Sequence, residues 1–390
     1  MGCSSSAKTR AGRRDASART PLQPGATLGV LGGGQLGRMF AHAATQMGYR
    51  VVVLDPAETG PAAEVASEHL RYAYDDAEGL ERLATMCDAV TTEFENVPSD
   101  SLRFLQQRVP VAPAPEAVEI AQNRIREKTF FVDNDLPTNH FERITVVADI
   151  DDAWQRMSSK AVIKTTQLGY DGKGQRVCNS ADDARHAFES FGKVECVLED
   201  FVAFDLEVSV VLARDCNGTV QTFPVVENSH KNGILDTCVV PARVSDAVSE
   251  NARTIACRLA EALDYVGVLA IEMFVADGRL LLNEIAPRPH NSGHYTLNAT
   301  SYSQFDQQVL TLCGLPAAAI ELYQPAVMFN ILGDLLLAEG FDWNAIHSVD
   351  CHLHMYGKAE ARAGRKMGHV NFVGEDVDQL LDSVGALRSR

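Results

Sequence analysis

Strands and helices alternate over the first third of the chain. Leu28–Leu31 is a short apolar run, and from Leu36 to Met47 the apolar residues recur at the spacing of one helix face. Arg50–Asp55 has the composition of a second buried strand. Further elements are expected at Leu80–Met86 (helix), Asp88–Phe94 (strand) and after Ser99 (helix). Such alternation predicts a parallel sheet of the Rossmann type.

The pattern changes further along the chain. A polar helix is predicted over 116–134, and short strands, a glycine-rich loop and a helix near 181–191 are predicted over 141–201. From 205 to 285, apolar strands are separated by dipeptides that favour two-residue hairpin turns. These dipeptides are Asn217-Gly218, Asn232-Gly233 and Asp277-Gly278. Antiparallel structure is therefore expected beyond residue 140, and the chain is predicted to combine α/β and α+β parts.

Composition narrows the class of protein. With 390 residues, 46% hydrophobic and 22% charged, the chain resembles an ordinary globular protein of two or three domains. No apolar stretch reaches the ~20 residues of a membrane span. A formal net charge of −17 disfavours nucleic acid as a partner. Nine cysteines without a CxxC pair or zinc-like spacing indicate reduced thiols and a cytoplasmic protein.

Residues 1–26 are expected to be a disordered extension, because the opening stretch is poor in apolar residues and rich in Ser, Ala and Arg. Gly2 and Ser6 fit the pattern for N-myristoylation, and Cys3 could carry a second acyl chain. A plain unstructured extension, or an upstream start codon, is the simpler explanation.

A glycine turn follows the first strand. Gly32, Gly34 and Gly37 form a GxGxxG motif, and Asp55 lies where a dinucleotide-binding protein places its ribose carboxylate. A helix N-terminus preceded by glycines also binds other phosphates. The motif alone therefore leaves NAD and a phosphorylated substrate as alternatives.

Two later stretches have the composition of a nucleotide site. KAVIKTTQLGYDGKGQ, 160–175, combines Lys164 on a strand with a loop in which glycines allow backbone N–H groups to surround an anion. A simple hairpin turn is the alternative. In LEDFV and DLEVSV, 198–210, acidic and apolar residues alternate, which also fits an exposed edge strand.

The stretch 271–294, IEMFVADGRLLLNEIAPRPHNSGH, is the most informative. A two-residue turn places Glu272 opposite Asn283, with Glu284 one residue further along. Two close carboxylates are unfavourable without a cation, and oxygen ligands suit Mg²⁺ shared with nucleotide phosphates. Two glutamates on opposite faces of an exposed hairpin are the alternative. Near the C-terminus, YGKAEARAGRKMGH, 356–369, forms a basic cluster in an acidic chain, either a phosphate site or a solvated turn.

Together these stretches resemble the ATP-grasp ligases and, among them, the N5-carboxyaminoimidazole ribonucleotide synthetases. The resemblance rests on five ordered motifs: GGGQLGRM, TEFENVP, IKTTQLGYDGKGQ, NEIAPRPHNSGH and YGKAEARAGRKMGH. It implies a three-domain ATP-grasp fold. The implied units are a Rossmann-like domain (27–125), a central lid domain (126–203) and a C-terminal domain (204–390) that ends in a subdomain (325–390).

The resemblance also assigns roles. For ATP it implies Arg124, Lys164, Gly169, Tyr170, Asp171, Gly172, Lys173, Gly174, Gln175, Glu199, Asp200, Phe201, Val202, Glu207, His230, Asn283 and Glu284. For magnesium it implies Glu272 and Glu284. For the ribonucleotide it implies Gly34, Gln35, Leu36, Glu93, Asn96, Arg288, Asn291, Ser292, Lys358, Arg365 and Lys366. The catalytic residues implied are Tyr170, Asp171, Lys173, His290 and Asn291.

Two positions depart from the pattern expected of this family. Ala286 stands where many ATP-grasp enzymes have Asn, so a metal ligand would come from Asn283 or water. Lys173 stands where Arg is expected, and a planar fork for bidentate contact is thereby lost.

The implied reaction is ATP-dependent carboxylation of 5-aminoimidazole ribonucleotide with bicarbonate, by a cytoplasmic enzyme that forms a homodimer. The alternatives are a formate-dependent glycinamide ribonucleotide transformylase, an NAD-dependent dehydrogenase and a nucleotide-binding regulator without turnover.

Overall fold

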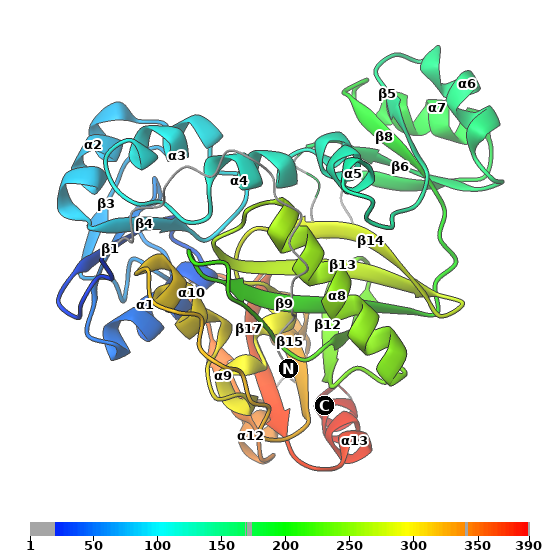
Figure 1. The fold of residues 1–390 in the computed structure, drawn as a ribbon. Coiled ribbons are helices and arrows are strands. Elements are labelled where there is room, and N and C mark those ends of the chain that lie inside the picture. Colours follow the sequence, from blue (N-terminus) through cyan, green and yellow to red (C-terminus); the bar gives the residue numbers. More distant parts are fainter. Residues whose placement is uncertain (1–19, 168, 170–173, 340–341, 389–390) are drawn as a thin grey trace.

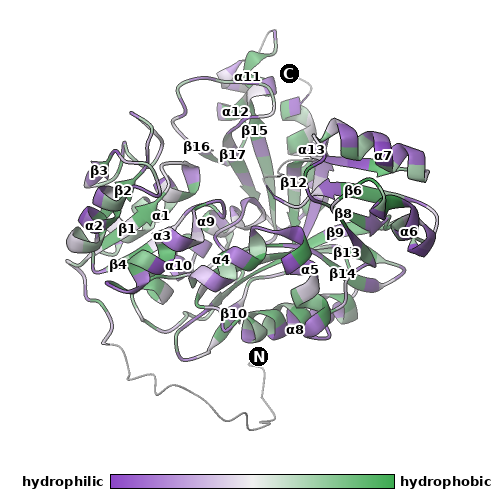
Figure 2. Cartoon of the chain, turned by 90° about the horizontal axis from the view of Figure 1, so that it is seen from above, coloured by the Kyte–Doolittle hydropathy of each residue, from purple (hydrophilic) through white to green (hydrophobic). Residues whose placement is uncertain are grey.

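The computed structural model describes residues 20–167, 169, 174–339 and 342–388, which form three β-sheets with helices around them (Figure 1). The first sheet lies in the N-terminal part, the second in a small lobe that stands apart, and the third runs through the centre. Figure 2, which is coloured by hydropathy, shows that the strands β1 and β2 are largely hydrophobic, whereas α6 and α7 are mostly hydrophilic. Among the described helices, none combines the length and the apolar character needed to cross a bilayer.

The N-terminal sheet is parallel, with the order β3-β2-β1-β4, as the alternating pattern predicts. Its strands are β1 (Thr27–Leu31), β2 (Arg50–Leu54), β3 (Glu68–Leu70) and β4 (Ala89–Thr92). Its helices are α1 (Gln35–Gln46), α2 (Ala77–Met86) and α3 (Ser99–Gln106). The glycine turn joins β1 to α1, so the turn lies at the carboxyl edge of the sheet, where ligands of such folds bind.

Residues 20–26, which were predicted to belong to a disordered extension, are part of the folded structure. The Leu22 N–H donates to the Cys313 carbonyl at 2.9 Å, and the Gly25 N–H donates to the Gly48 carbonyl at 2.8 Å. Leu22 also packs against the core of the N-terminal unit. Gly2, Cys3 and Ser6, the candidates for acylation, lie outside the described residues.

Two helices replace the single polar helix predicted over 116–134. They are α4 (Pro115–Ala121) and α5 (Arg124–Asp133). The side-chain oxygen of Asn123 accepts the N–H groups of Ile125 and Arg126 at 3.0 and 3.1 Å, and thereby caps α5. An N-cap residue has extended backbone, so the chain breaks at Asn123 and α5 starts in a new direction, against the central sheet.

The small lobe contains an antiparallel sheet of order β5-β8-β6-β7. Its strands are β5 (Phe141–Ile144), β6 (Ala161–Thr165), β7 (Gln175–Cys178) and β8 (Cys196–Asp200). Two helices cover it, α6 (Asp149–Arg156) and α7 (Ala181–Ser190), of which the sequence predicted only the second. The glycine-rich stretch lies between β6 and β7 in the sequence, and the structure describes it only in part.

The central sheet has nine strands in the order β14-β13-β9-β11-β12-β15-β17-β16, with β10 paired to β9. The strands are β9 (Leu206–Arg214), β10 (Val220–Thr222), β11 (Val226–Lys231), β12 (Ile234–Val240), β13 (Gly267–Ala276), β14 (Arg279–Ala286), β15 (Ala326–Leu332), β16 (His352–Met355) and β17 (Lys366–Val373). All three predicted hairpins are confirmed, because the turns join β9 to β10, β11 to β12 and β13 to β14. The last two have two-residue loops, whereas the connection from β9 to β10 spans 215–219.

Helices complete the core around the central sheet. They are α8 (Asp246–Ala262), the 3₁₀ turn η1 (Asn291–Gly293), α9 (Thr296–Ala299), α10 (Gln304–Leu312), α11 (Gly333–Leu337), α12 (Trp343–His347) and α13 (Val377–Arg388). The sequence analysis missed α8, which packs its apolar face on β9, β13 and β14. Helix α10 buries Phe305 and Val309 against α1, and thereby joins the N-terminal unit to the central sheet.

Candidate active site

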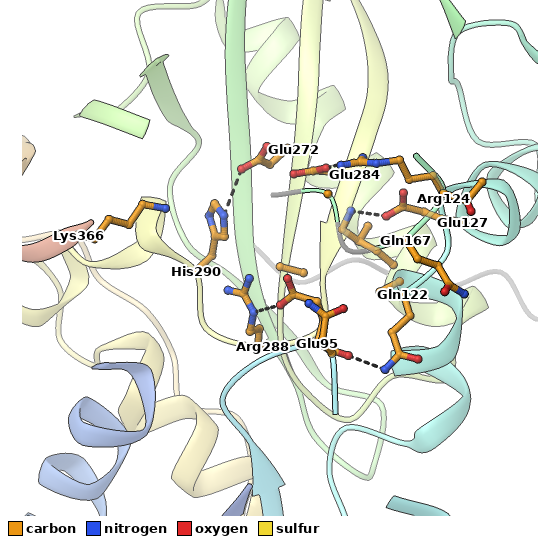
Figure 3. Close-up of a pocket in the computed structure, with 16 residues that line it drawn as sticks. Glu95, Gln122, Arg124, Glu127, Gln167, Glu272, Glu284, Arg288, His290 and Lys366 are labelled. Carbon is orange, nitrogen blue, oxygen red and sulfur yellow. Dashed lines mark hydrogen bonds and ion pairs between the residues drawn. The ribbon is translucent and has the colours of Figure 1, made fainter. Parts of the chain in front are cut away.

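One cleft runs between the small lobe, the central sheet and the N-terminal unit. It consists of cavities that share lining residues: Lys164 and Glu207 line two of them, and His290 and Lys366 line three. The cleft therefore connects the segment after β8 with the glycine turn before α1. Figure 3 shows its central part, in which side chains from α5, β13, β14 and the loop after β14 converge.

The outer cavity of the cleft, of about 460 Å³, lies beside the segment that follows β8. It is lined by Asp200, Phe201 and Val202, three of the residues for which the resemblance implies contact with ATP. Phe204 stacks on Phe274 at this cavity, with ring centroids 4.7 Å apart. A flat, partly apolar space beside backbone groups is suited to a planar heterocycle.

Glu199 has a role that the sequence analysis did not anticipate. Its carboxylate is buried between two lysines, with Oε2 3.1 Å from the Lys164 Nζ and 3.3 Å from the Lys128 Nζ. Asn139 donates to the same oxygen at 3.1 Å. Burial alone would raise the pKa of Glu199, but the two lysines lower it to about 2. Glu199 therefore holds Lys164 in place, and both residues line the outer cavity.

Glu207 and His230 form a pair on β9 and β11. They are hydrogen-bonded through the His230 Nδ1. Both line the inner of the two neighbouring cavities, and Glu207 also lines the outer one. Burial opposes protonation of the imidazole, but the bond to Glu207 and the neighbouring Glu272 and Glu284 raise the pKa of His230. The His230 imidazole, which lies beside the cavity, therefore binds a proton more readily than an ordinary histidine does.

The register of the β13–β14 hairpin differs from the prediction. A β-bulge follows the pair Met273 and Leu282, so that Glu272 lies opposite Glu284 and not opposite Asn283. Residues directly opposite each other in an antiparallel pair share a face. The two glutamates therefore face the same cavity, and Asn283, the extra residue of the bulge, lines it as well.

Helix α5 holds one of these glutamates. The Arg124 Nη1 lies 2.8 Å from the Glu284 Oε2, and the Ile285 N–H donates to the Glu127 Oε1 at 2.7 Å (Figure 3). Burial and the Glu284 charge raise the pKa of Glu127 to about 8. Burial and Glu284 likewise raise the pKa of Glu272 to about 7, whereas Arg124 lowers that of Glu284 against the effect of burial.

The loop after β14 places His290 next to the carboxylates. Its Nε2 lies 3.2 Å from the Glu272 Oε1, and its Nδ1 lies 2.9 Å from the Ser292 Oγ. Burial, with Arg288 and Lys366 nearby, lowers the pKa of His290 well below its usual value. The Ser292 N–H donates to Nδ1 at 3.3 Å, so the neutral ring carries its proton on Nε2 and donates it to Glu272.

Two further residues of this loop were predicted to bind substrate. Ser292 is fully buried and bonded to the Ser209 Oγ at 2.8 Å, so it contacts His290 rather than the cleft. Asn291 lines the cleft, and neither polar atom of its buried side chain has a hydrogen-bond partner among the described residues. An amide in that state is a candidate for ligand contact.

The glycine turn is partly occupied by the protein's own carboxylates. Glu93 accepts the N–H of Gly34 and, at 2.8 Å, that of Gly37, while Asp55 accepts the N–H of Gly33 at 2.7 Å. Asp55 therefore supports the turn and is not positioned as a ribose ligand. Glu93, predicted to bind substrate, also lines the cavity at the turn beside Gln35 and Leu36.

Arg288 reaches this cavity from the loop after β14, but its guanidinium is paired with Glu95, in the segment after β4. Burial opposes ionisation of Glu95, and Arg288 nevertheless lowers the pKa of Glu95 to about 2. The pair joins the N-terminal unit to the central sheet at the floor of the cleft. Asn96, the next residue, lines the neighbouring cavity.

Of the three predicted basic residues near the C-terminus, Lys366 lines the cleft. Lys358 donates to the Lys366 carbonyl at 2.7 Å. Arg365 donates to the Glu360 carbonyl at 2.8 Å, on an exposed turn. The structure thus brings Lys366 to the lining of the cleft, whereas Lys358 and Arg365 are not among the lining residues of these cavities.

The glycine-rich loop is described only in part, since Tyr170, Asp171, Gly172 and Lys173 lie outside the described residues. Gly169 lines the central cavity, and Gln175 lines the two outer ones. Gly174 has a φ of +71°, and a Cβ there would lie 2.6 Å from the Thr165 Oγ1. A side chain at this position, where the loop rejoins β7, would therefore be strained.

Comparison with known proteins identifies the family. Residues 25–122 match the ribonucleotide synthetase preATP-grasp domain, 129–305 the ATP-grasp domain, and 326–383 the phosphoribosylaminoimidazole carboxylase C-terminal domain. The N5-carboxyaminoimidazole ribonucleotide synthase of Brucella melitensis is 44% identical, with 90% of this chain and 97% of that protein covered. The chain belongs to the N5-carboxyaminoimidazole ribonucleotide synthase family. The Bacillus subtilis member is 40% identical, with 93% of this chain and 95% of that protein covered.

Solved structures of this family have the same fold. An ADP complex of an N5-carboxyaminoimidazole ribonucleotide synthetase has a TM-score of 0.91 at 41% identity, covering 94% of this chain and 97% of that one. The Aspergillus clavatus enzyme, in complex with ADP and 5-aminoimidazole ribonucleotide, has a TM-score of 0.87 at 29% identity, covering 94% and 98%. The ATP-grasp fold predicted from the motifs is confirmed.

Three charged residues at this family member's cleft were not predicted from the sequence: Glu95 and Glu127 line the cleft, and Lys128 is a buried partner of Glu199. Glu95 stands inside the quoted TEFENVP motif, and Glu127 and Lys128 follow Arg124 by one helical turn. The available signal was the charged run Arg124–Lys128 on a helix with buried positions, since buried charges are rare unless they are paired. Their partners come from distant strands and are not visible in the sequence.

Proposed function

We propose that the chain carboxylates 5-aminoimidazole ribonucleotide with bicarbonate, consuming ATP and releasing ADP and phosphate, in purine biosynthesis. The observation that carries the proposal is the single cleft, in which a base-sized cavity, two facing carboxylates and a pocket at a glycine turn share lining residues. The names of the family members support the same reaction.

ATP is proposed to lie between the small lobe and the central sheet. The base would occupy the cavity at Asp200–Val202, and the ribose would contact Glu207. The phosphates would lie at Arg124 and Lys164, whose positive charges are held in place by Glu284 and Glu199. The predicted lid, which includes Gly169 and Gln175, would cover the phosphates, as phosphoryl transfer requires exclusion of water.

The donor set at the centre of the cleft fits Mg²⁺. Glu272 and Glu284 face each other, and their mutual repulsion contributes to the raised pKa of Glu272, so a divalent cation between them would be favoured. The described residues contain no cluster of three or more His, Cys, Asp or Glu arranged for a metal. Phosphate oxygens and water would therefore complete the coordination, as is usual for Mg²⁺. When bound, the cation would neutralise charge on the transferring phosphoryl group.

The ribonucleotide is proposed to bind at the inner end of the cleft. Its 5′-phosphate would lie at the start of α1, near Gln35, Leu36 and the Lys366 ammonium, which line one pocket. Glu93 already accepts the N–H groups of Gly34 and Gly37, so the phosphate would contact Gln35 and Leu36, which lie between these two glycines. Asn291 would contact the substrate with its unpartnered amide.

The chemistry proposed has two steps. A bicarbonate oxygen attacks the γ-phosphorus, the bond to ADP breaks, and carboxyphosphate forms. The 5-amino nitrogen then forms a bond to the carboxyl carbon, phosphate leaves with the electron pair of its C–O bond, and the nitrogen loses a proton. Release of CO₂ from carboxyphosphate before the second bond forms would give the same products.

His290 is poorly placed to take that proton, because its Nδ1 accepts from Ser292 and its Nε2 carries a proton toward Glu272. We therefore propose Asp171, which lies outside the described residues, as the proton acceptor, and His290 as a residue that orients Glu272. Asp171→Asn is expected to block carboxylation while ATP still binds.

The test is the co-substrate dependence of ADP release. ADP formation that requires both bicarbonate and 5-aminoimidazole ribonucleotide supports the proposal. ADP formation with formate and glycinamide ribonucleotide alone would assign the chain to the transformylase reaction instead. Tight ATP binding without turnover under either condition would favour a regulator.

A homodimer and a cytoplasmic location complete the proposal. The dimer is inferred from the family resemblance, and the location from the pathway. Light scattering of the purified chain tests the dimer, because a monomer at micromolar concentration would contradict it.

A further inference from the structure

The positions of Asn283 and Glu284 depend on the bulge in β14. In a regular strand, neighbouring side chains point to opposite faces, so only one of these two residues could face the cleft. The bulge between the pairs Met273–Leu282 and Glu272–Glu284 removes that restriction, and both residues line the same cavity. Whatever fixes the bulge therefore fixes the donor set of the site.

Two outward N–H groups bracket the bulge on the outer edge of β14, which is the first strand of the central sheet. The Leu282 N–H donates to the Pro137 carbonyl at 2.8 Å, and the Ile285 N–H donates to the Glu127 Oε1 at 2.7 Å. Outward N–H groups of a regular strand are two residues apart, but these two are three apart, as one inserted residue requires. The Glu127 carboxylate thus receives a bond whose position exists only because of the bulge.

Helix α5 positions Glu127 for this contact. Asn123 caps the helix and fixes its start, and Arg124 and Glu127 follow one turn apart on the same face. Arg124 binds the Glu284 side chain while Glu127 binds the backbone of the next residue (Figure 3). Glu127 is 2% exposed, so water does not compete for the Ile285 N–H.

We propose that Glu127 is a positioning residue, which holds the β14 bulge and thereby keeps Asn283 and Glu284 directed at a magnesium nucleotide. The proposal rests on the proposed function only in placing the nucleotide at this end of the cleft. It concerns binding of the nucleotide and does not depend on which substrate is carboxylated.

The test compares Glu127→Leu, which removes the acceptor at similar volume, with Glu127→Gln, which keeps an acceptor oxygen. Calorimetry measures the affinity for a non-hydrolysable ATP analogue with and without Mg²⁺. In Glu127→Leu, the increase in affinity that Mg²⁺ produces is expected to be about tenfold or more smaller than in the wild type. A loss of this order is expected because the buried Ile285 N–H would have no acceptor. In Glu127→Gln, the increase is expected to stay within about threefold of the wild-type value. The dissociation constant for the ribonucleotide is expected to stay within about twofold in both variants.

Glu227→Leu is the matched control. Glu227 is also a buried glutamate that accepts a backbone N–H, from Arg243 at 3.2 Å, but it lies on β11 away from the cleft cavities. This variant is expected to lower the melting temperature and to leave the Mg²⁺-dependent gain unchanged. An equal loss of the gain in both Leu variants would show a general effect of destabilisation and would overturn the proposal.

A folded Glu127→Leu with the full Mg²⁺-dependent gain would also overturn it. If Glu127→Leu does not fold, hydrogen exchange of the Ile285 amide decides, because strong protection is expected in wild type and in Glu127→Gln, and rapid exchange in wild type would refute the contact. A wild-type protein that binds the magnesium nucleotide but does not carboxylate the ribonucleotide would refute the proposed function and leave this inference standing.

Discussion

Replacement of Glu95 by Gln is expected to destabilise the chain, because Glu95 pairs with Arg288 between the N-terminal unit and the central sheet. Arg288 prevails over burial and lowers the pKa of Glu95 from 4.5 to about 2. One pKa unit corresponds to about 1.4 kcal/mol, so the ionised carboxylate contributes about 3 kcal/mol to folding at neutral pH. The Glu95 side chain is 27% exposed, so solvent screens its charge only in part, and about 3 kcal/mol holds as an order of magnitude.

The loss in Glu95→Gln has a second cause, since the Arg288 guanidinium remains buried without its partner. The double variant Glu95→Gln/Arg288→Met removes the unpaired charge and is expected to be less destabilised than the sum of the two single variants. Urea unfolding at pH 7 of the wild type and the three variants measures both effects. The folded pKa of Glu95 is lowered, so its contribution is complete above the unfolded pKa and is lost only as pH falls from about 4.5 to about 2.

The expected gap between wild type and Glu95→Gln is therefore constant between pH 6 and pH 8. A gap below about 1 kcal/mol, typical of an exposed pair, would refute the reasoning. Strict additivity of the two single variants would refute it as well, because it would mean that the two side chains do not interact.

Three further predictions concern the cleft and the core. Glu284→Ala is expected to abolish turnover and to leave ribonucleotide affinity nearly intact in equilibrium binding, because Glu284 lines the cavity proposed for the nucleotide phosphates and not the pocket at the glycine turn. Lys366→Ala is expected to raise the KM for the ribonucleotide by about tenfold, and Arg365→Ala by much less, in steady-state kinetics, since only Lys366 lines the pocket. Burial, with His352 nearby, lowers the pKa of His354 to about 4, so the unfolded chain binds the extra proton and stability falls as pH drops from about 6.5 to 4. Urea unfolding as a function of pH measures this effect. In His354→Leu, the slope of the unfolding free energy against pH is expected to decrease by up to the contribution of one proton, about 1.4 kcal/mol per pH unit.

Much of the fold could be predicted because local signals determine it. The three hairpin dipeptides specify turns through their own backbone preferences, and each joins two paired strands. The glycine turn and the helix after it were predictable for the same reason. Helix α8 was missed although Ser245 caps it and its apolar residues lie on one face, so the signal was present in the sequence.

The details of the site depend on contacts between distant segments. The pairing of Glu272 with Glu284 requires a bulge, and Glu127 and Pro137, far away in sequence, stabilise it from the strand edge. The chain break at Asn123 depends on a cap that competes with continuous helix. A sequence pattern indicates which residues are charged and buried, but it does not indicate which distant charge each one meets.

Transfer of isotope from bicarbonate to phosphate tests the central claim most directly, namely that bicarbonate attacks ATP within this cleft. With ¹⁸O-labelled bicarbonate, ATP and 5-aminoimidazole ribonucleotide, the account predicts that the inorganic phosphate released carries one labelled oxygen per turnover. Unlabelled phosphate, formed while ADP accumulates, would show that water attacks the γ-phosphorus and would contradict the account.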